Sequence, residues 1–196
     1  MTKSYDINLS NEEKKYLLQT ARQVIASEIK GLEANFEAHY SDGLNTKTGV
    51  FVTIKIHEEL RGCIGYIKGY SALVESVRKM AISAAFHDPR FNPISESELS
   101  DAEIEISVLS PMIRVKNLTE IEVGRDGLLI RRLPHEGLLL PQVATEYNWS
   151  RETLLNQTCL KANIDQSAWK DPITEIYRFS AVIFKESDFQ NSTRLS

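Results

Sequence analysis

The sequence predicts an α+β fold in which an antiparallel sheet is flanked by helices. Two segments, residues 11–30 and 73–84, repeat their apolar side chains at helical spacing. Two others, residues 50–56 and 104–108, alternate apolar and polar side chains, which is typical of strands with one face in a core. The connection at residues 57–59 is short enough for a hairpin, and hairpin strands pair in antiparallel fashion.

The first helix is expected over residues 11–30. Ser10 and Glu13 have the spacing of a capping box, in which each side chain accepts a hydrogen bond from the backbone of the other. Gly31 is placed to end or bend this helix. The polar residues 1–10 are expected to form a disordered tail.

A hairpin and a second helix follow. The strand at residues 50–56 is expected to turn back into a strand around Cys63. The helix that begins near residue 73 stops at a segment containing Pro89 and Pro93, whose rings fix the backbone. A loop with so much fixed backbone and a neighbouring charge pair is a candidate binding loop. The alternative is that Asp88 pairs with Arg90 or with the backbone in a purely structural role.

The second half of the chain predicts short strands, two helices and a final strand. Pro111 interrupts the apolar pattern after residue 108, so a bend or an edge strand is expected there. The short strands and helices are expected at residues 128–130, at residues 138–140, from Pro141 and after Ser150. Residues 176–184 are apolar on both faces and predict a central strand, and residues 187–196 are expected to be a polar tail.

The composition limits the classes of function. The chain has 196 residues, 42% of them hydrophobic and 26% charged, with a formal net charge of −4. This length suits one domain or two closely packed lobes. The acidic balance argues against nucleic-acid or membrane binding through bulk charge. Because two cysteines make no disulfide framework and no apolar run has the length of a membrane span, a cytoplasmic location is expected.

One stretch, residues 58–67, combines a charge, a thiol and two glycines within an apolar run. Arg61 and Cys63 are two apart in a predicted strand, so they are expected on one face with Cα atoms about 7 Å apart. A guanidinium at that range is expected to lower the pKa of the thiol towards neutrality. Gly62 and Gly65 allow close approach of another backbone or of a ligand. The alternative is that Cys63 fills space in the core and Arg61 forms a structural ion pair.

Several segments occur in the order seen in one protein family. They are Leu60-Arg61-Gly62-Cys63-Ile64-Gly65, residues 49–53, Asp88-Pro89-Arg90-Phe91, residues 124–128, residues 137–144, and Lys161-Ala162 with Trp169. With these segments the chain resembles the AMMECR family, whose prokaryotic members are called system protein A of the AmmeMemoRadiSam group. The resemblance covers about residues 10–186 and rests mainly on the hexapeptide. Residues 57–59 lack the turn glycine that is usual in the family.

The resemblance implies a single domain over residues 11–186, made of two closely packed lobes. The hexapeptide is expected near a cleft between these lobes, and Gln142, within a matching segment, is expected among the binding residues. The resemblance also implies an association with a Memo-like protein and a radical-SAM protein. It implies no settled activity and leaves any cofactor unknown.

A first hypothesis for function is an enzyme. Cys63 would be the nucleophile, Arg61 its electrostatic partner or substrate anchor, and His87 or His57 the base. A metal site that uses Cys63 with His57, His87 or His135 is disfavoured, because these residues lack the paired spacing of metal-binding motifs.

The second hypothesis is a binding module without covalent chemistry. Arg61, the glycines and the loop with Asp88 and Arg90 would hold a peptide, a cofactor or a partner enzyme. Arginine suits this task because its planar guanidinium recognises carboxylates and phosphates. This hypothesis is favoured because no complete catalytic triad can be assembled from the sequence.

Overall fold

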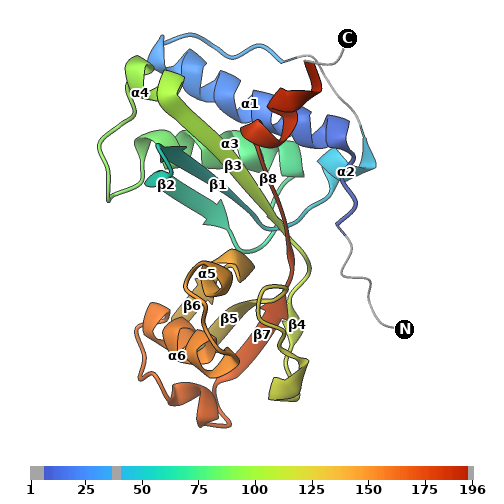
Figure 1. Cartoon of the computed structure of the whole chain (residues 1–196), viewed down its shortest axis with the longest axis vertical. Coiled ribbons are helices and arrows are strands. Elements are labelled where there is room, and N and C mark those ends of the chain that lie inside the picture. The colour runs from blue at the N-terminus through green and yellow to red at the C-terminus, as the bar shows by residue number, and fades with distance from the viewer. Residues whose placement is uncertain (1–6, 37–40, 194–196) are drawn as a thin grey trace. The chain divides into compact units, whose positions relative to one another are not determined.

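The structure is a computed structural model and describes residues 7–36 and 41–193, with side chains through residue 189 (Figure 1). The fold is α+β with antiparallel pairing, as predicted, but its strands form two sheets where the sequence predicted one. The chain divides into two compact units. We call residues 7–109 together with the described residues from 182 onwards the discontinuous unit, and residues 110–181 the inserted unit.

The discontinuous unit contains a four-stranded sheet and its helices. In pairing order the strands are β2 (Glu59–Tyr66), β1 (Val50–Ile56), β3 (Ala102–Leu109) and β8 (Ala181–Lys185). The helices are α1 (Asn11–Ile29), α2 (Asp42–Asn45), α3 (Leu73–Phe86), α4 (Glu96–Asp101) and the 3₁₀ helix η3 (Glu186–Thr193). Val50, Val52 and Ile54 of β1 are fully buried in one core with the apolar faces of α1 and α3. This burial explains the alternation in the sequence, because successive side chains of a strand point to opposite faces.

The capping box that the sequence predicts at the start of α1 is present. The backbone N–H of Glu13 donates to Ser10 Oγ at 3.2 Å, and the N–H of Ser10 donates to Glu13 Oε2 at 2.7 Å. Gly31 follows the helix with a φ of +64°, a conformation that glycine adopts without strain. Residues 1–6 of the predicted tail lie outside the described residues, whereas Ile7 and Leu9 pack against the core.

The predicted hairpin is confirmed, although its turn contains no glycine. His57 and Glu58 both have positive φ, of 52° and 66°, as the central residues of a two-residue type I′ turn do. β1 and β2 pair in antiparallel fashion, with a register shift between Ile54 and Lys55. Because Ile54 pairs with Gly62 and Lys55 with Leu60, Arg61 has no partner residue on β1. It therefore occupies a β-bulge, a feature that can redirect a side chain.

The inserted unit contains the second sheet. In pairing order its strands are β4 (Ile113–Arg114), β7 (Glu175–Phe179), β5 (Gly127–Arg132) and β6 (His135–Leu139). Its helices are α5 (Pro141–Glu146), α6 (Arg151–Lys161) and the 3₁₀ helices η1 (Leu118–Glu120) and η2 (Ala168–Lys170). β4 is an edge strand, which agrees with the expectation after Pro111. The core of the inserted unit contains Leu128 and Ile130 from β5 together with Leu154 and Leu155 from α6.

The prediction of one central strand over residues 176–184 is wrong. The chain forms β7 in the middle of one sheet and β8 at the edge of the other. Ser180 separates them: its N–H donates to Ser110 Oγ at 2.9 Å, and its carbonyl accepts from the N–H of Ser110 at 2.8 Å. Ile176 belongs to the core of the inserted unit and Phe184 to that of the discontinuous unit. An apolar run shows that side chains are buried but not that they enter two different cores.

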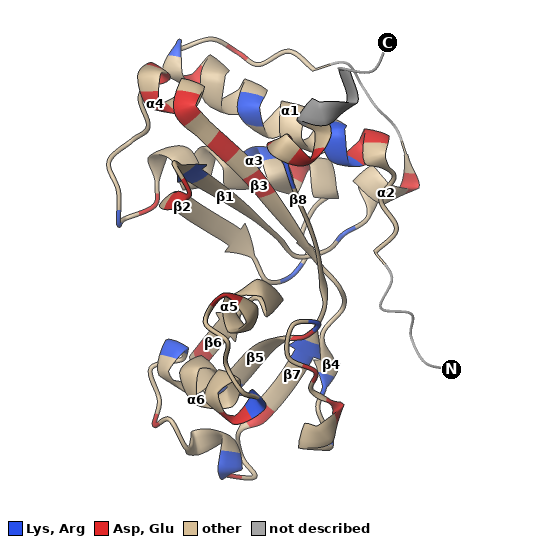
Figure 2. Ribbon diagram, viewed as in Figure 1, with Lys and Arg blue, Asp and Glu red and all other residues tan. Residues whose placement is uncertain are grey.

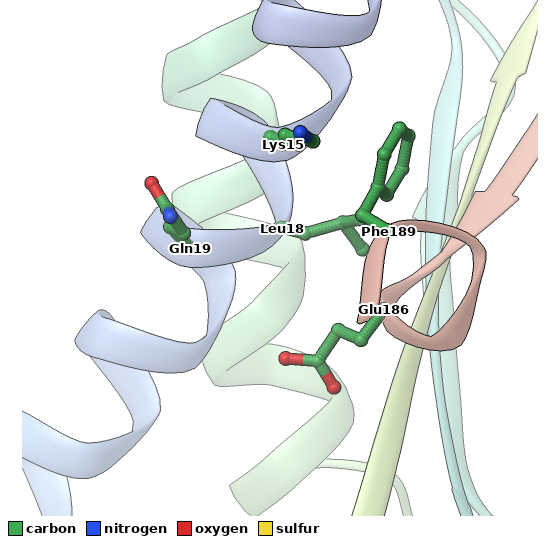
Figure 3. A pocket seen from close by; sticks show the side chains of 5 residues that line it. All are labelled: Lys15, Leu18, Gln19, Glu186 and Phe189. Atoms are coloured by element: carbon green, nitrogen blue, oxygen red, sulfur yellow. The ribbon is translucent and has the colours of Figure 1, made fainter. Parts of the chain in front are cut away.

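The residues after Lys185, predicted to be a polar tail, begin with η3. Glu186 Oε2 accepts a hydrogen bond from Arg22 Nη2 at 2.6 Å, and Phe189 packs against the core. Figure 3 shows the resulting cavity of about 320 Å³, lined by Lys15, Leu18 and Gln19 from α1 and by Glu186 and Phe189 from η3. Among the described residues, no helix is long and apolar enough to cross a membrane.

Candidate functional site

The hexapeptide lies on β2, the edge strand of the sheet in the discontinuous unit. The backbone N–H of Cys63 donates to Asp88 Oδ2 at 2.9 Å, and its carbonyl accepts from Arg90 Nη2 at 3.3 Å. These two side chains thus bind the outer edge of β2, where a further strand would otherwise pair. Covering an edge in this way prevents pairing with other chains.

Asp88 is the centre of this arrangement. Its side chain is only 1% exposed, and it accepts from the Nε and Nη2 of Arg90 at 2.9 and 2.6 Å. The backbone N–H of Arg90 donates to the same carboxylate at 3.1 Å. The hydrogen bonds from the Arg90 side chain, and those from the backbone of Cys63 and Arg90, hold the pKa of Asp88 well below its usual range. Asp88 is therefore ionised at neutral pH and fixes the loop at residues 87–93 to β2.

Arg61 binds the same loop at a second point. Its Nε donates to Glu98 Oε1 at 2.8 Å, and its Nη2 donates to the carbonyl of Asn92 at 2.9 Å. Its guanidinium lies 5.8 Å from the centre of the Phe91 ring. The hydrogen bonds from Arg61, followed by one from the backbone of Ser95, lower the pKa of Glu98 to about 2. Arg61 therefore anchors residues 91–98. This agrees with the alternative that Arg61 forms a structural ion pair.

The expectation that Arg61 lowers the pKa of Cys63 is wrong. Cys63 is half-buried, and burial raises the pKa of its thiol above the ordinary value. The hydroxyl of Thr53, which donates to the sulfur at 3.2 Å, and the charge of Arg90 oppose this shift without cancelling it. The bulge and the Glu98 carboxylate direct Arg61 elsewhere, so the thiol stays protonated at neutral pH.

We expect the Cys63 thiol to react slowly with iodoacetamide near pH 7. Because burial raises its pKa, the midpoint of the rate profile should lie above the ordinary thiol value of about 8.5. Mass spectrometry of the peptide containing Cys63, over samples alkylated from about pH 6 to about pH 10, measures this profile. The same peptide from urea-unfolded protein is the control and should titrate normally. A midpoint near or below neutrality in the folded protein would restore the nucleophile hypothesis.

Among the described residues, no hydrogen bond joins the Cys63 thiol to His57, His87 or His135. His87 is the exposed C-cap residue of α3, and His57 is in the hairpin turn. The side chains that shift the pKa of Cys63 are Thr53, Arg90, Asp88 and Glu105, and no histidine is among them. His135 begins β6 in the inserted unit. Within residues 7–36 and 41–193, no group of three His, Cys, Asp or Glu side chains could hold a metal ion.

The two glycines of the hexapeptide serve packing within the chain. A Cβ on Gly62 would lie 2.1 Å from the carbonyl oxygen of Ala84, so β2 and α3 approach here as closely as backbones can. A Cβ on Gly65 would lie 2.3 Å from the ring of Phe51, its cross-strand partner. The sequence allowed either another backbone or a ligand to approach Gly62 closely. In the structure the backbone of α3 occupies this space.

The structure brings Arg61, Cys63, Asp88 and Arg90 together in the discontinuous unit, and their role as a binding site stays a prediction. Gln142 lies in the first turn of α5 and thus belongs to the inserted unit. The cleft between two lobes stays a prediction. Sequence analysis missed Glu98, the carboxylate that captures Arg61, and Thr53, whose hydroxyl contacts the thiol.

The comparisons with known proteins agree with this α+β fold. The AMMECR1 family model matches residues 18–184. A protein of Methanothermobacter thermautotrophicus is 40% identical over 185 residues, covering 91% of this chain and 96% of its own. A protein of Thermococcus onnurineus is 49% identical over 150 residues, covering 71% of this chain and 73% of its own.

A solved structure has the same fold. The crystal structure of the uncharacterized protein PH0010 from Pyrococcus horikoshii superposes with a TM-score of 0.86 and 37% identity, over 91% of this chain and 93% of that one. These matches place the chain in a class of α+β proteins whose names give no function. The chain belongs to the AMMECR1 family.

Proposed function

We propose that this protein is a binding protein whose recognition surface is the loop at residues 87–93 beside the outer edge of β2. One observation carries the proposal: two arginine–carboxylate pairs fix this loop. The Asp88–Arg90 pair binds Cys63 near the start of the loop, and the Arg61–Glu98 pair holds its end. A loop that is held in place before a ligand arrives loses little conformational entropy on binding.

The fixed loop presents side chains suited to recognition. Arg90 is half exposed, and among the described residues no hydrogen bond reaches its Nη1. The ring of Phe91 is partly exposed between two guanidiniums, with Arg90 at 5.4 Å from its centre. The side chain of Asn92 is exposed. Only its backbone carbonyl takes part in the hydrogen bonds that fix the loop. Arginine and aromatic side chains are enriched among residues that dominate binding energy.

The enzyme alternative receives less support. A nucleophilic cysteine needs a lowered pKa or an adjacent base, whereas burial raises the pKa of Cys63 and no histidine acts on it. The thiol instead accepts a hydrogen bond from Thr53. These contacts suit a residue that joins β1 to β2 beneath a binding surface.

The partners that we propose are the Memo-like and radical-SAM proteins that the family resemblance implies, in the cytoplasm. The role of the protein would be to hold or present a partner enzyme. Chemistry would then reside in the partner.

A binding measurement with two matched variants tests this proposal. Asn92→Arg places a long charged side chain in the centre of the loop and leaves the backbone bond to Arg61 intact. Asn35→Arg makes the same change at an exposed asparagine of the same unit whose carbonyl alone is bonded, to Gln23. Affinity for the purified Memo-like and radical-SAM proteins should fall about tenfold or more in Asn92→Arg and stay unchanged in Asn35→Arg. Failure of the wild-type protein to bind either partner, or equal binding by both variants, would refute the proposal.

A further inference from the structure

We propose that the inserted unit contains a separate site for a small oxyanion, in a cavity lined by Arg125, Arg151 and Arg178. The cavity has a volume of about 710 Å³, and residues 119–122 complete its wall. All of these residues belong to the inserted unit, so the proposal is independent of the binding surface on the discontinuous unit.

A buried carboxylate binds one of the three guanidiniums and lies near a second. Asp126 is fully buried and accepts from the Nε and Nη2 of Arg125 at 3.0 and 2.6 Å. The backbone N–H of Glu122 donates to the same carboxylate at 2.9 Å, and Arg178 Nη1 lies 3.9 Å from it. A carboxylate removed from water is stable only when it is paired and hydrogen-bonded. Asp126 thus holds Arg125 at the cavity wall and attracts Arg178.

The third guanidinium is held differently. Arg151, the first residue of α6, donates from Nε to the carbonyl of Ile121 at 2.8 Å. This bond uses the Nε of a side chain that lines the cavity, and among the described residues no hydrogen bond reaches its two Nη groups. Within the described part of the chain, no carboxylate lies within ion-pair distance of Arg151. A guanidinium presents its donors in a fixed fork that matches the oxygens of carboxylates and phosphates.

The acidic residues around the cavity limit how much negative charge a ligand can carry. Glu122 lies 2.6 Å from Arg125, and Glu120 lies 3.7 Å from Arg178. Each of the three carboxylates around the cavity, Glu120, Glu122 and Asp126, thus lies beside Arg125 or Arg178, and Arg151 is the guanidinium that has no such neighbour among the described residues. Figure 2 shows basic and acidic residues close together around β4 and β7. Two carboxylates at the wall would repel a polyanion such as nucleic acid. The site suits a small molecule with one carboxylate or phosphate group.

Two-dimensional ¹H–¹⁵N NMR of the full chain tests the site with inorganic phosphate and with acetate as separate probes. At constant ionic strength, at least one probe should give saturable shifts of the amides at residues 119–126 and 151–153. The probe that saturates identifies a phosphate-type or a carboxylate-type ligand. Matched additions of sodium chloride should not reproduce the shifts. If neither probe saturates, or if chloride gives the same shifts, the proposal is wrong.

Variants locate the bound anion. Arg151→Gln should weaken binding about tenfold or more, because it removes the guanidinium without a carboxylate partner. Arg132→Gln, which removes an arginine paired with Asp171 in the same unit, should leave binding unchanged. Thr119→Glu adds a negative charge to the wall and should also weaken binding, so the test does not depend on one variant folding correctly. Unchanged binding in both Arg151→Gln and Thr119→Glu would overturn the assignment.

Discussion

Replacing Gly62 with alanine is expected to lower the free energy of unfolding of the discontinuous unit by about 3 kcal/mol. The new methyl carbon would lie 2.1 Å from the carbonyl oxygen of Ala84 and 3.1 Å from its carbonyl carbon. Both atoms are backbone of α3, so no side-chain rotation can relieve the overlap. The helix would have to move away from β2, and apolar contacts of the core would be lost. Urea unfolding followed by circular dichroism measures the change.

Gly31→Ala is the matched control in the same unit. No atom lies within 4 Å of a Cβ at this position, but the φ of +64° disfavours alanine. The cost should therefore be only about 1 kcal/mol, from backbone conformation alone. A smaller loss in Gly62→Ala than in Gly31→Ala would mean that β2 and α3 do not pack at this distance. Because α3 leads directly into the binding loop, Gly62→Ala should also weaken partner binding.

Local structure was predictable because it depends on neighbouring residues. The capping box at Ser10 and Glu13 needs two side chains three residues apart, and both hydrogen bonds form. The alternating strand at Val50–Ile56 needs only one buried face. The break at Ser180 was not predictable in this way, because it depends on Ser110, 70 residues earlier. A continuous apolar run contains no sign that a distant residue divides it between two sheets.

The contacts of the candidate residues could not be predicted from their spacing in the sequence. Arg61 was expected to lower the pKa of Cys63 because the two residues are two apart on a strand. Their spacing carries no information about hydrogen-bond acceptors elsewhere in the chain. Glu98 had a signal of its own, since Ser95 and Glu98 have the spacing of a capping box and place a carboxylate at the start of α4. Arg61 Nη2 lies 3.2 Å from the Glu98 oxygen that also accepts from the N–H of Ser95.

The contact between Thr53 and Cys63 depends on the bulge. With a two-residue turn at His57 and Glu58 and regular pairing, Thr53 would face Gly62. The extra residue at position 61 shifts the register by one, so that Thr53 pairs with Cys63. Nothing in the local pattern marks a bulge at that point. The environment of the thiol therefore follows from one irregularity that arises only in the folded sheet.

Asp88→Asn is expected to lower the free energy of unfolding at pH 7 by about 2–3 kcal/mol. The substitution keeps an acceptor for the N–H of Cys63 but removes the charge that pairs with Arg90. The estimate lies below that for a fully buried pair because Arg90 is half exposed to solvent. Exposed Glu96, which lies 3.5 Å from Lys30, provides the control: Glu96→Gln should cost less than about 0.5 kcal/mol.

The pH dependence separates the charge of Asp88 from its packing. Its pKa is lower in the folded protein than in the unfolded chain, so its contribution is complete above the unfolded value of about 3.9. It is lost as the pH falls from about 5 through the folded pKa, because the carboxylate becomes protonated in both states. The wild-type protein should therefore lose stability in acid, and its advantage over Asp88→Asn should shrink.

Urea unfolding of both proteins at pH 7 and near pH 3 measures this difference. Glu98, whose pKa is lowered to about 2 by Arg61, is present in both proteins, so its titration cancels when the two are compared. An advantage of the same size at both pH values would show that the carboxylate's charge does not hold the loop. Since Asp88 joins the loop to the edge of β2, a charge-dependent advantage would also show that this ion pair, beside the Arg61–Glu98 pair, stabilises the framework of the proposed binding surface.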